Sequence, residues 1–425
     1  MPCLDGTVTW MVSDITSRML TKSIGDQEFA GQFLRSLAKT YYQCADIGEC
    51  FAAVSGVGKG DYDAWYGGWK KMADRIRSLA AESLSEGDIV GAHDSFLRAG
   101  EYYRQAMWFL RDNLDDPRLL RAANDIRACF REGVRFEDTP VRAVEIPYEG
   151  TTLPGYLYHV DDTGIPRPTF VMPGGYDSIV EECYAVGAKG AVRRGYNFLA
   201  FDGPGQGHAL LRKRLYLRPD FERVISPVLD WLFRQPEVDT ERVVLMGRSF
   251  GGYLAPRGAC GEERLAGLVC DPGLFDIGIL VDRILPPEVV ARWRTGDADG
   301  VNAYFDDLFA SDPGRKFYFI NRMRAHGVST VYDYLTEMAR YTYRDRVAAI
   351  ACPTLICCTA TDPLAVQSAD LYRALAAPKE YRVFESAAGA GAHTEAGATG
   401  QFEKEIFGWA RRVFEKPRAA APLRG

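Results

Sequence analysis

A serine lies between glycines at the end of a strand-like segment, in VVLMGRSFGGYLA at residues 243–255. The apolar, β-branched residues predict a buried strand, and the residues after the glycines predict a helix. Gly247 and Gly251 flank Ser249 in the pattern G-x-S-x-G, and Gly252 follows. A sharp turn with small residues on both sides exposes a serine hydroxyl at the end of a strand. We therefore predict that Ser249 is a nucleophile; the alternative is a glycine-rich turn whose serine has no chemical role.

A serine hydroxyl needs an imidazole to take its proton and a carboxylate to orient that imidazole. On a strand-turn-helix serine, the acid and then the histidine are expected later in the chain. Only His326 and His393 follow Ser249, among the five histidines His93, His159, His208, His326 and His393. His326 lies in a segment that we predict to be a lid, whereas His393 lies in the loop AAGAGAHTEAG after the last apolar strand. We predict His393 as the base.

The carboxylate is expected at the end of the strand that precedes the histidine loop. Asp362 follows the apolar run PTLICCT, in TATDPLA. The alternatives are that Asp362 only makes an Asx turn before Pro363, or that Glu385 or Glu395 is the acid in its place. The long separation of Asp362 from Ser249 predicts an inserted segment between two strands.

Attack on a carbonyl creates an oxyanion that needs two preorganised N–H donors. One is expected to be the backbone N–H of Phe250, directly after the nucleophile. For the second we favour the N–H of Tyr176 in the loop MPGGYDS, with that of Gly175 as the alternative. The following Glu181 has a local explanation, because its spacing from Ser178 is that of a capping box.

Short apolar runs separated by helix-length segments predict the elements that position these residues. The runs TFVMPGG, YNFLAFDGPG, RVVLMGRS, LAGLVCDPG, CPTLICCTATD and EYRVFES are typical of parallel strands buried on both faces. Before them, VRAVEIPYEG and TTLPGYLYHV predict an antiparallel hairpin. The fold class is therefore α/β, with a doubly wound, mostly parallel sheet whose loops carry the site.

Helical periodicity on both sides of the sheet pattern divides the chain into four segments. We expect an N-terminal helical cap domain at 1–135, the first part of the sheet domain at 136–274, a helical lid at 275–347 and the second part of the sheet domain at 348–425.

Several further residues are candidates for substrate contacts. The loop FDGPGQG lacks the residues of a nucleotide-binding loop, so its end is expected to form part of a cleft. In the N-terminal segment, core packing of aromatic residues is the first expectation and an aromatic-binding pocket is the alternative. The candidates are Gln206, His208, Arg248, Glu101 and Tyr102.

The composition excludes several classes of partner. The 425 residues have a net charge of -6 and no block of basic residues, which argues against nucleic acid. The start MPCLDGTVTWMVSD does not resemble a signal peptide and no window is apolar enough for a spanning helix, so we expect a cytoplasmic protein with no membrane contact. The ten scattered cysteines are expected to be reduced core thiols, and no metal or other cofactor is implied.

Taken in chain order, a helical N-terminal domain, GGYDSIVEE, FDGPGQG, GRSFGGYLA, a lid, TATDP and GAGAHTEAG resemble the α/β-hydrolases grouped around 2,6-dihydroxypseudooxynicotine hydrolase. The fungal pigment hydrolases that shorten polyketide chains and the esterases of the fermentation-respiration switch type are related to this group. The resemblance implies the α/β-hydrolase fold, a homodimer, a site between core and cap, and an additional acid for which Asp282 and Glu288 are candidates. One departure is Ala392, which stands where relatives often have an acidic residue before the histidine.

Four functions are compatible with these features. The leading hypothesis is a serine hydrolase that cleaves a carbon-carbon bond beside a ketone, in a small aromatic or polyketide-like substrate. A carbon leaving group must delocalise its charge, as a β-diketone or an acyl-phenol allows. The alternatives are a carboxylesterase or lactonase, an acyltransferase or cyclase that excludes water, and a binding protein without catalysis.

Overall fold

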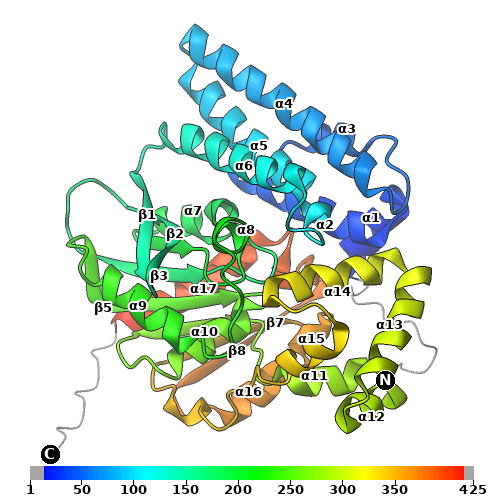
Figure 1. Cartoon of the computed structure of the whole chain (residues 1–425). Helices are drawn as coiled ribbons and strands as arrows, with labels where there is room; N and C mark the ends of the chain where they lie inside the picture. The colour runs from blue at the N-terminus through cyan, green and yellow to red at the C-terminus, as the bar shows by residue number, and fades with distance from the viewer. Residues whose placement is uncertain (1–13, 416–425) are drawn as a thin grey trace, which may run out of the picture.

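Eight strands form one sheet in this computed structural model, which describes residues 14–415 (Figure 1). Their order across the sheet is β1-β2-β4-β3-β5-β6-β7-β8, and every pairing from β4 to β8 is parallel. The strands are β1 (Val141–Tyr148), β2 (Thr151–Tyr158), β3 (Arg167–Pro173), β4 (Asn197–Phe201), β5 (Val238–Arg248), β6 (Gly267–Asp271), β7 (Thr354–Thr359) and β8 (Lys379–Phe384). The predicted α/β class with a mostly parallel sheet is confirmed.

The predicted hairpin is also present. β1 and β2 pair antiparallel along their whole length, and Glu149 and Gly150 make the turn with φ of 39° and 78°. Positive φ at both central residues matches the right-handed twist of the two strands.

Alternate residues of the central strands pack into two separate hydrophobic layers. Leu199 and Leu245 lie in one layer with side chains of α9 (Glu222–Leu232) and α10 (Gly251–Ala259). Their sequence neighbours, such as Met246, lie in the other layer with α7 (Lys189–Val192) and α17 (Thr399–Glu415). Burial on both faces explains why these strands are almost continuously apolar in sequence. The remaining helices of the sheet region are α8 (Gly207–Lys213) and α16 (Ser368–Ala374).

Six helices before the sheet form a bundle with its own core, gathered at the top of Figure 1. Trp65 and Trp69 are fully buried in that core, with ring centroids 5.6 Å apart. An aspartate precedes every one of the six, and its carboxylate accepts a backbone N–H of the first turn, which satisfies a donor that the helix leaves unpaired. The helices are α1 (Ile15–Ile24), α2 (Gln27–Ala38), α3 (Ile47–Val54), α4 (Tyr62–Glu86), α5 (Ile89–Met107) and α6 (Pro117–Val134).

Five more helices lie between β6 and β7, where the sequence predicts a lid. They are α11 (Ile277–Ile284), α12 (Pro287–Thr295), α13 (Ala298–Ser311), α14 (Pro313–His326) and α15 (Val331–Met338). Phe317 of α14 packs against Tyr62 and Phe109 of the N-terminal helices, with ring centroids 5.7 and 5.1 Å away. The insertion and the N-terminal bundle therefore touch each other beside the sheet (Figure 1).

Two other expectations concern the cysteines and the membrane. The nine cysteines among residues 14–415 are buried thiols, while Cys3 lies outside the described residues. Within the same residues, no helix combines the length and the apolar character that crossing a membrane requires. The expected absence of a signal peptide falls on residues 1–13, also outside the described range.

We expect Gly252→Ala to lower the free energy of unfolding by about 1–3 kcal/mol, the usual range for overpacking. A Cβ at Gly252 would lie 1.9 Å from the carbonyl oxygen of Pro272, whereas one at Gly251 would meet nothing closer than the Gly174 oxygen at 3.3 Å. Gly251→Ala is therefore the matched control and should change stability by less than about 1 kcal/mol. Urea denaturation followed by circular dichroism measures both; equal stabilities of the two variants would contradict the close approach.

Candidate active site

Ser249 occupies a strained turn between β5 and α10. Its φ is 56°, in the left-handed region that is costly for a residue with a side chain. The Ser249 N–H donates to the carbonyl oxygen of Asp271 at 2.6 Å, which ties the turn to the end of β6. A Cβ at Gly247 would lie 1.9 Å from the Gly251 oxygen, so only glycine fits the sharp reversal there. The G-x-S-x-G pattern is thus explained by backbone packing.

The structure brings Ser249, His393 and Asp362 together. The Oγ of Ser249 lies 2.8 Å from Nε2 of His393, and Nδ1 of His393 lies 2.5 Å from Oδ2 of Asp362. With the carboxylate accepting from Nδ1–H, Nε2 is left free to accept the serine proton. Burial of Asp362 would raise its pKa, but the charge of His393 and its hydrogen bond outweigh burial and hold the pKa below its ordinary value.

Two of the alternatives for the acid, the Asx turn at Asp362 and Glu395, make defined contacts in the structure. The second oxygen of Asp362 accepts the N–H of Leu364 at 2.9 Å, so the predicted Asx contact and the histidine contact coexist on one carboxylate. Glu395 lies behind His393 and reaches Arg248 at 3.4 Å. Burial and the neighbouring Asp271 raise the pKa of Glu395 well above its ordinary value. Asp362 is therefore the anion that faces the imidazole.

Two amide groups beside Ser249 are available to an oxyanion. Among residues 14–415, neither the N–H of Phe250 nor that of Tyr176 has an acceptor. The N–H of Gly175, the alternative donor, is already bonded to Oγ of Ser178 at 2.8 Å. A Cβ at Gly175 would lie 3.2 Å from Cβ of Ser249, so the loop after β3 lies directly against Ser249.

Gln206 holds that loop instead of contacting substrate. Its amide nitrogen donates to the carbonyls of Gly174 and Gly175 at 2.5 and 3.1 Å, and its oxygen accepts the N–H of Gly203 at 2.8 Å. The side chain is fully buried, so the prediction of a substrate contact is wrong. Gln206 is instead a positioning residue.

The side chains of His208 and Arg248 likewise bond to other residues of the protein. His208 is buried and bonds to Glu181 through Nε2, 3.0 Å from the nearer oxygen. Arg248 joins the end of β6 to the histidine loop, because it donates to Asp271 at 2.9 Å and also to the carbonyl of Thr394. The donors of both are satisfied within the fold, which for the buried His208 corrects the expectation that it contacts substrate. Arg248 lines a small hollow beside Ser249, so its contact with substrate stays a prediction.

The two acids that the resemblance suggests, Asp282 and Glu288, are not among the residues that line the large cavity over Ser249. Asp282 pairs with Arg294 of α12 at 2.5 Å, and Glu288 is an exposed residue of the first turn of α12. An acid at that position is favourable because it faces the positive end of the helix dipole. Neither provides the expected additional acid.

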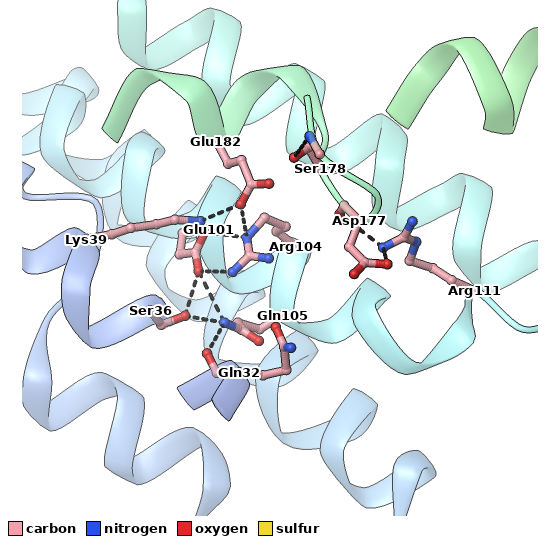
Figure 2. A network of polar contacts seen from close by, with 11 residues as sticks. Gln32, Ser36, Lys39, Glu101, Arg104, Gln105, Arg111, Asp177, Ser178 and Glu182 are labelled. Atoms are coloured by element: carbon pink, nitrogen blue, oxygen red, sulfur yellow. Dashed lines mark hydrogen bonds and ion pairs between the residues drawn. The ribbon is translucent and has the colours of Figure 1, made fainter. Parts of the chain in front are cut away.

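Glu101 belongs to a buried network between α2, α5 and the loop after β3 (Figure 2). It accepts Nζ of Lys39 at 2.6 Å and a two-pronged contact from Arg104 at 2.7 and 2.8 Å. Burial favours the neutral acid, but Arg104 and Lys39 outweigh it and lower the pKa of Glu101 to about 2. Tyr102 donates to Glu49 within the helical core. Core packing, the first expectation for this segment, is what the structure shows.

A cavity of about 1020 Å³ opens over Ser249 and His393. Its wall combines the N-terminal bundle, the sheet loops and the insertion, and it includes residues that no local motif indicated. These are Gln32, Arg35, Trp108, Phe109, Asn321 and Arg322. No spacing rule could find them, because they come from helices far apart in the chain.

Tyr176 connects this wall to the insertion. Its hydroxyl bonds to Nε2 of His326, whose Nδ1 lies 3.1 Å from the hydroxyl of Tyr341. Burial, with the charge of Arg322, lowers the pKa of His326 to about 3. His326 is therefore a neutral bridge between two tyrosines that fixes the side chain of the loop residue next to Ser249.

The strand order, the serine turn and the loops that follow β3, β7 and β8 define an α/β-hydrolase. The chain belongs to the alpha/beta hydrolase family, whose model matches residues 170–398. The Esterase FrsA-like model matches residues 48–278, which include much of the N-terminal bundle.

Curated relatives support this assignment. Hydrolase LUC6 of Fusarium sp is 37% identical over 77% of this chain and 81% of its own length. Hydrolase acrC of Aspergillus aculeatus is 34% identical over 92% of this chain and 97% of its own length. The 20-hydroxy-prefusarin hydrolase FUS2 of Gibberella moniliformis is 34% identical over 77% of this chain and 81% of its own length. The crystal structure of 2,6-dihydroxy-pseudo-oxynicotine hydrolase shares the fold, with a TM-score of 0.69 and 19% identity over 89% and 95% of the two chains. The homodimer implied by the resemblance stays a prediction.

We expect His326→Gln to flatten the pH dependence of stability. The pKa of about 3 in the folded state lies below that of an unfolded histidine, so only the unfolded chain gains this proton as the pH falls below about 6.5. Above that pH, His326 makes its full contribution to the free energy of unfolding. Below it, this contribution falls by about 1.4 kcal/mol per pH unit. Urea denaturation at pH 7, 6 and 5 measures the difference between wild type and variant.

His93→Gln is the matched control with the opposite sign. Burial opposes the charged form of His93, but hydrogen bonds to Glu137 and Asp94 outweigh it and raise its pKa. Its contribution is present at low pH and lost as the pH rises, so removal of His93 should steepen the acid loss of stability. A His326→Gln curve parallel to that of the wild type would disprove the neutral bridge.

Proposed function

We propose that this protein is a serine hydrolase in which Ser249 is the nucleophile, His393 the general base and acid, and Asp362 the residue that orients the imidazole. The observation that carries the proposal is the continuous hydrogen-bonded chain of these side chains beneath one large cavity. The Oγ of Ser249 attacks a carbonyl carbon while Nε2 of His393 takes its proton. The N–H groups of Phe250 and Tyr176 stabilise the oxyanion.

We further propose that the bond cleaved is a carbon-carbon bond beside a ketone. The electron pair of that bond passes to the departing carbon as an enolate or an electron-rich ring, and His393 returns its proton to that carbon. Water then hydrolyses the acyl group on Ser249 by the same route. The aromatic rings of Trp108, Phe109 and Tyr334 in the cavity wall suit an aromatic or polyketide-like substrate. The relative that acts on 20-hydroxy-prefusarin supports a small-molecule substrate.

A carboxylesterase is the second candidate, and the match to the Esterase FrsA-like model favours it. The attack by Ser249 and the final hydrolysis of the acyl group are the same, but an alcohol leaves more easily than a carbon. The two candidates therefore differ in the product and not in the nucleophile.

Ser249→Ala should lower kcat by at least about 10⁴-fold, because no other group supplies the nucleophile. A fluorophosphonate should label the wild type at Ser249 and leave the variant unlabelled, as mass spectrometry of the digested protein reports. Ser311→Ala is the matched control, since Ser311 also lies in the cavity wall and should leave kcat within about threefold. Turnover retained by Ser249→Ala would refute the mechanism.

A panel of substrates distinguishes the two candidates. We expect the wild type to release a carboxylic acid and a methyl ketone from aryl β-diketones, with the product masses identified by chromatography and mass spectrometry. Each substrate is paired with an aryl ester of similar size, and Ser249→Ala is the blank. Release of products from the esters alone would reject carbon-carbon cleavage and leave the carboxylesterase.

A further inference from the structure

Arg35 presents an unpaired guanidinium to the cavity above Ser249. The side chain extends from α2 over the ring of Trp108, with its Cζ 5.3 Å from the ring centroid. Among residues 14–415, no acceptor lies within hydrogen-bond distance of this guanidinium and no carboxylate forms an ion pair with it. A guanidinium has five N–H donors and stays charged at neutral pH. The donors of Arg35 are therefore available to a ligand in the cavity.

The carboxylates nearest to Arg35 already have closer cations. Glu101 is bound by Lys39 at 2.6 Å and by Arg104 at 2.7 Å. Glu182 lies 3.1 Å from Lys39 and 3.5 Å from Arg104. Figure 2 shows both acids between these two cations, close to the loop after β3.

The third acid, Asp177, is held by Arg111 at 3.2 Å. Three guanidinium groups, those of Arg35, Arg104 and Arg111, lie over the ring of Trp108. Arg104 and Arg111 each pair with a carboxylate, whereas no ion pair joins Arg35 to an acid among residues 14–415. Burial lowers the pKa of Arg35, against the attraction of Asp177 and Glu182. An uncompensated charge of this kind is costly, and a ligand anion would remove the cost.

Arg322 of α14 lies on the other side of Asp177 and lines the same cavity. Its guanidinium stacks on Tyr318 at 3.4 Å and lies 5.2 Å from the ring of Tyr176. Its Nη2 is 3.9 Å from Asp177, and its charge also acts on Glu28, a half-buried acid of α2 in the cavity wall. Arg322 is thus partly neutralised, whereas Arg35 has no carboxylate partner among residues 14–415.

Arg35 also lies near the reacting atoms. It lines a hollow of about 110 Å³ that touches Ser249, His393 and the Tyr176 loop. Its charge contributes to the lowered pKa of Asp362. A substrate whose carbonyl reaches Ser249 therefore has a second group within reach of Arg35.

We propose that Arg35 is a specificity-determining residue that binds a two-oxygen anionic group of the substrate, a carboxylate or the enolate of a 1,3-dicarbonyl unit that does not include the carbonyl attacked by Ser249. Both groups present two oxygens in a plane, which fits the guanidinium fork. Trp108 holds the guanidinium by its ring face, and no other contact has to be broken for the ligand to bind. The inference rests on the proposed function at Ser249, because it assigns the second binding group of the same substrate.

Kinetics with two matched esters test the proposal. The mono-p-nitrophenyl ester of glutaric acid has a free carboxylate, whereas p-nitrophenyl valerate has a similar chain without charge. We expect the wild type to prefer the glutarate ester, and Arg35→Gln to raise KM for that ester about 10- to 100-fold. The valerate ester should change by less than about threefold. Arg35→Lys keeps the charge but loses the two-pronged geometry of the guanidinium. Its KM for the glutarate ester should lie between those of the wild type and Arg35→Gln.

Arg121→Gln is the matched control, because Arg121 is an exposed residue of α6 and its loss changes the net charge equally. Equal effects of Arg35→Gln on both esters, or no preference of the wild type for the carboxylate, would overturn the proposal.

A binding experiment separates this inference from the proposed function, since it needs no turnover. Calorimetry with Ser249→Ala should detect 4-phenylbutyrate but not 4-phenylbutyramide if the ligand is a carboxylate. Benzoylacetone that binds more tightly as the pH approaches its ionisation would identify the enolate instead. Either signal should disappear in the Ser249→Ala, Arg35→Gln double variant. Binding of the anion without ester turnover would refute the hydrolase alone, and anion binding that survives the loss of Arg35 would refute the role of Arg35.

Discussion

The turn at Ser249 is the constraint on which the rest of the site depends. A residue with a side chain is held at φ 56°, and the chain reverses so closely that Gly247 nearly touches the Gly251 carbonyl. The hydrogen bond from the Ser249 N–H to the Asp271 carbonyl stabilises this conformation from the next strand. The same turn sets the direction of both the hydroxyl and the Phe250 N–H, so a relaxed backbone would lose both at once.

Loops from four strands meet this turn because the carboxyl ends of parallel strands lie at one edge of a sheet. Three separate parts of the molecule hold the loop after β3. Gln206 binds its carbonyls from the sheet region, Arg111 binds the Tyr176 carbonyl from the N-terminal bundle, and His326 binds the Tyr176 hydroxyl from the insertion. The accessory helices are therefore part of the site's support as well as its cover.

Buried charges connect the N-terminal bundle to the sheet. Lys39, Arg104, Glu101 and Glu182 pair with one another, with all but Glu182 almost fully buried (Figure 2). Such a network adds little net stability, because desolvation offsets the attraction, but removing one member leaves a costly charge. Its effect is to fix one arrangement of bundle and loop. Arg35, for which no acid partner lies among residues 14–415, is at the point where this network meets the cavity.

Local order was predictable from the sequence alone. The strand segments, the β1–β2 hairpin, the strand-turn-helix at Ser249 and the roles suggested for Asp362 and His393 each depend on a few neighbouring residues, since sterics and periodicity act over short distances. The substrate contacts were not predictable in this way. Gln206, His208, Arg248 and Glu101 have suitable chemistry, but their donors and acceptors are satisfied inside the fold. The sequence did not indicate Arg35, because its guanidinium lacks a partner only when the nearby acids pair with other cations. The packing of distant helices decides those pairs.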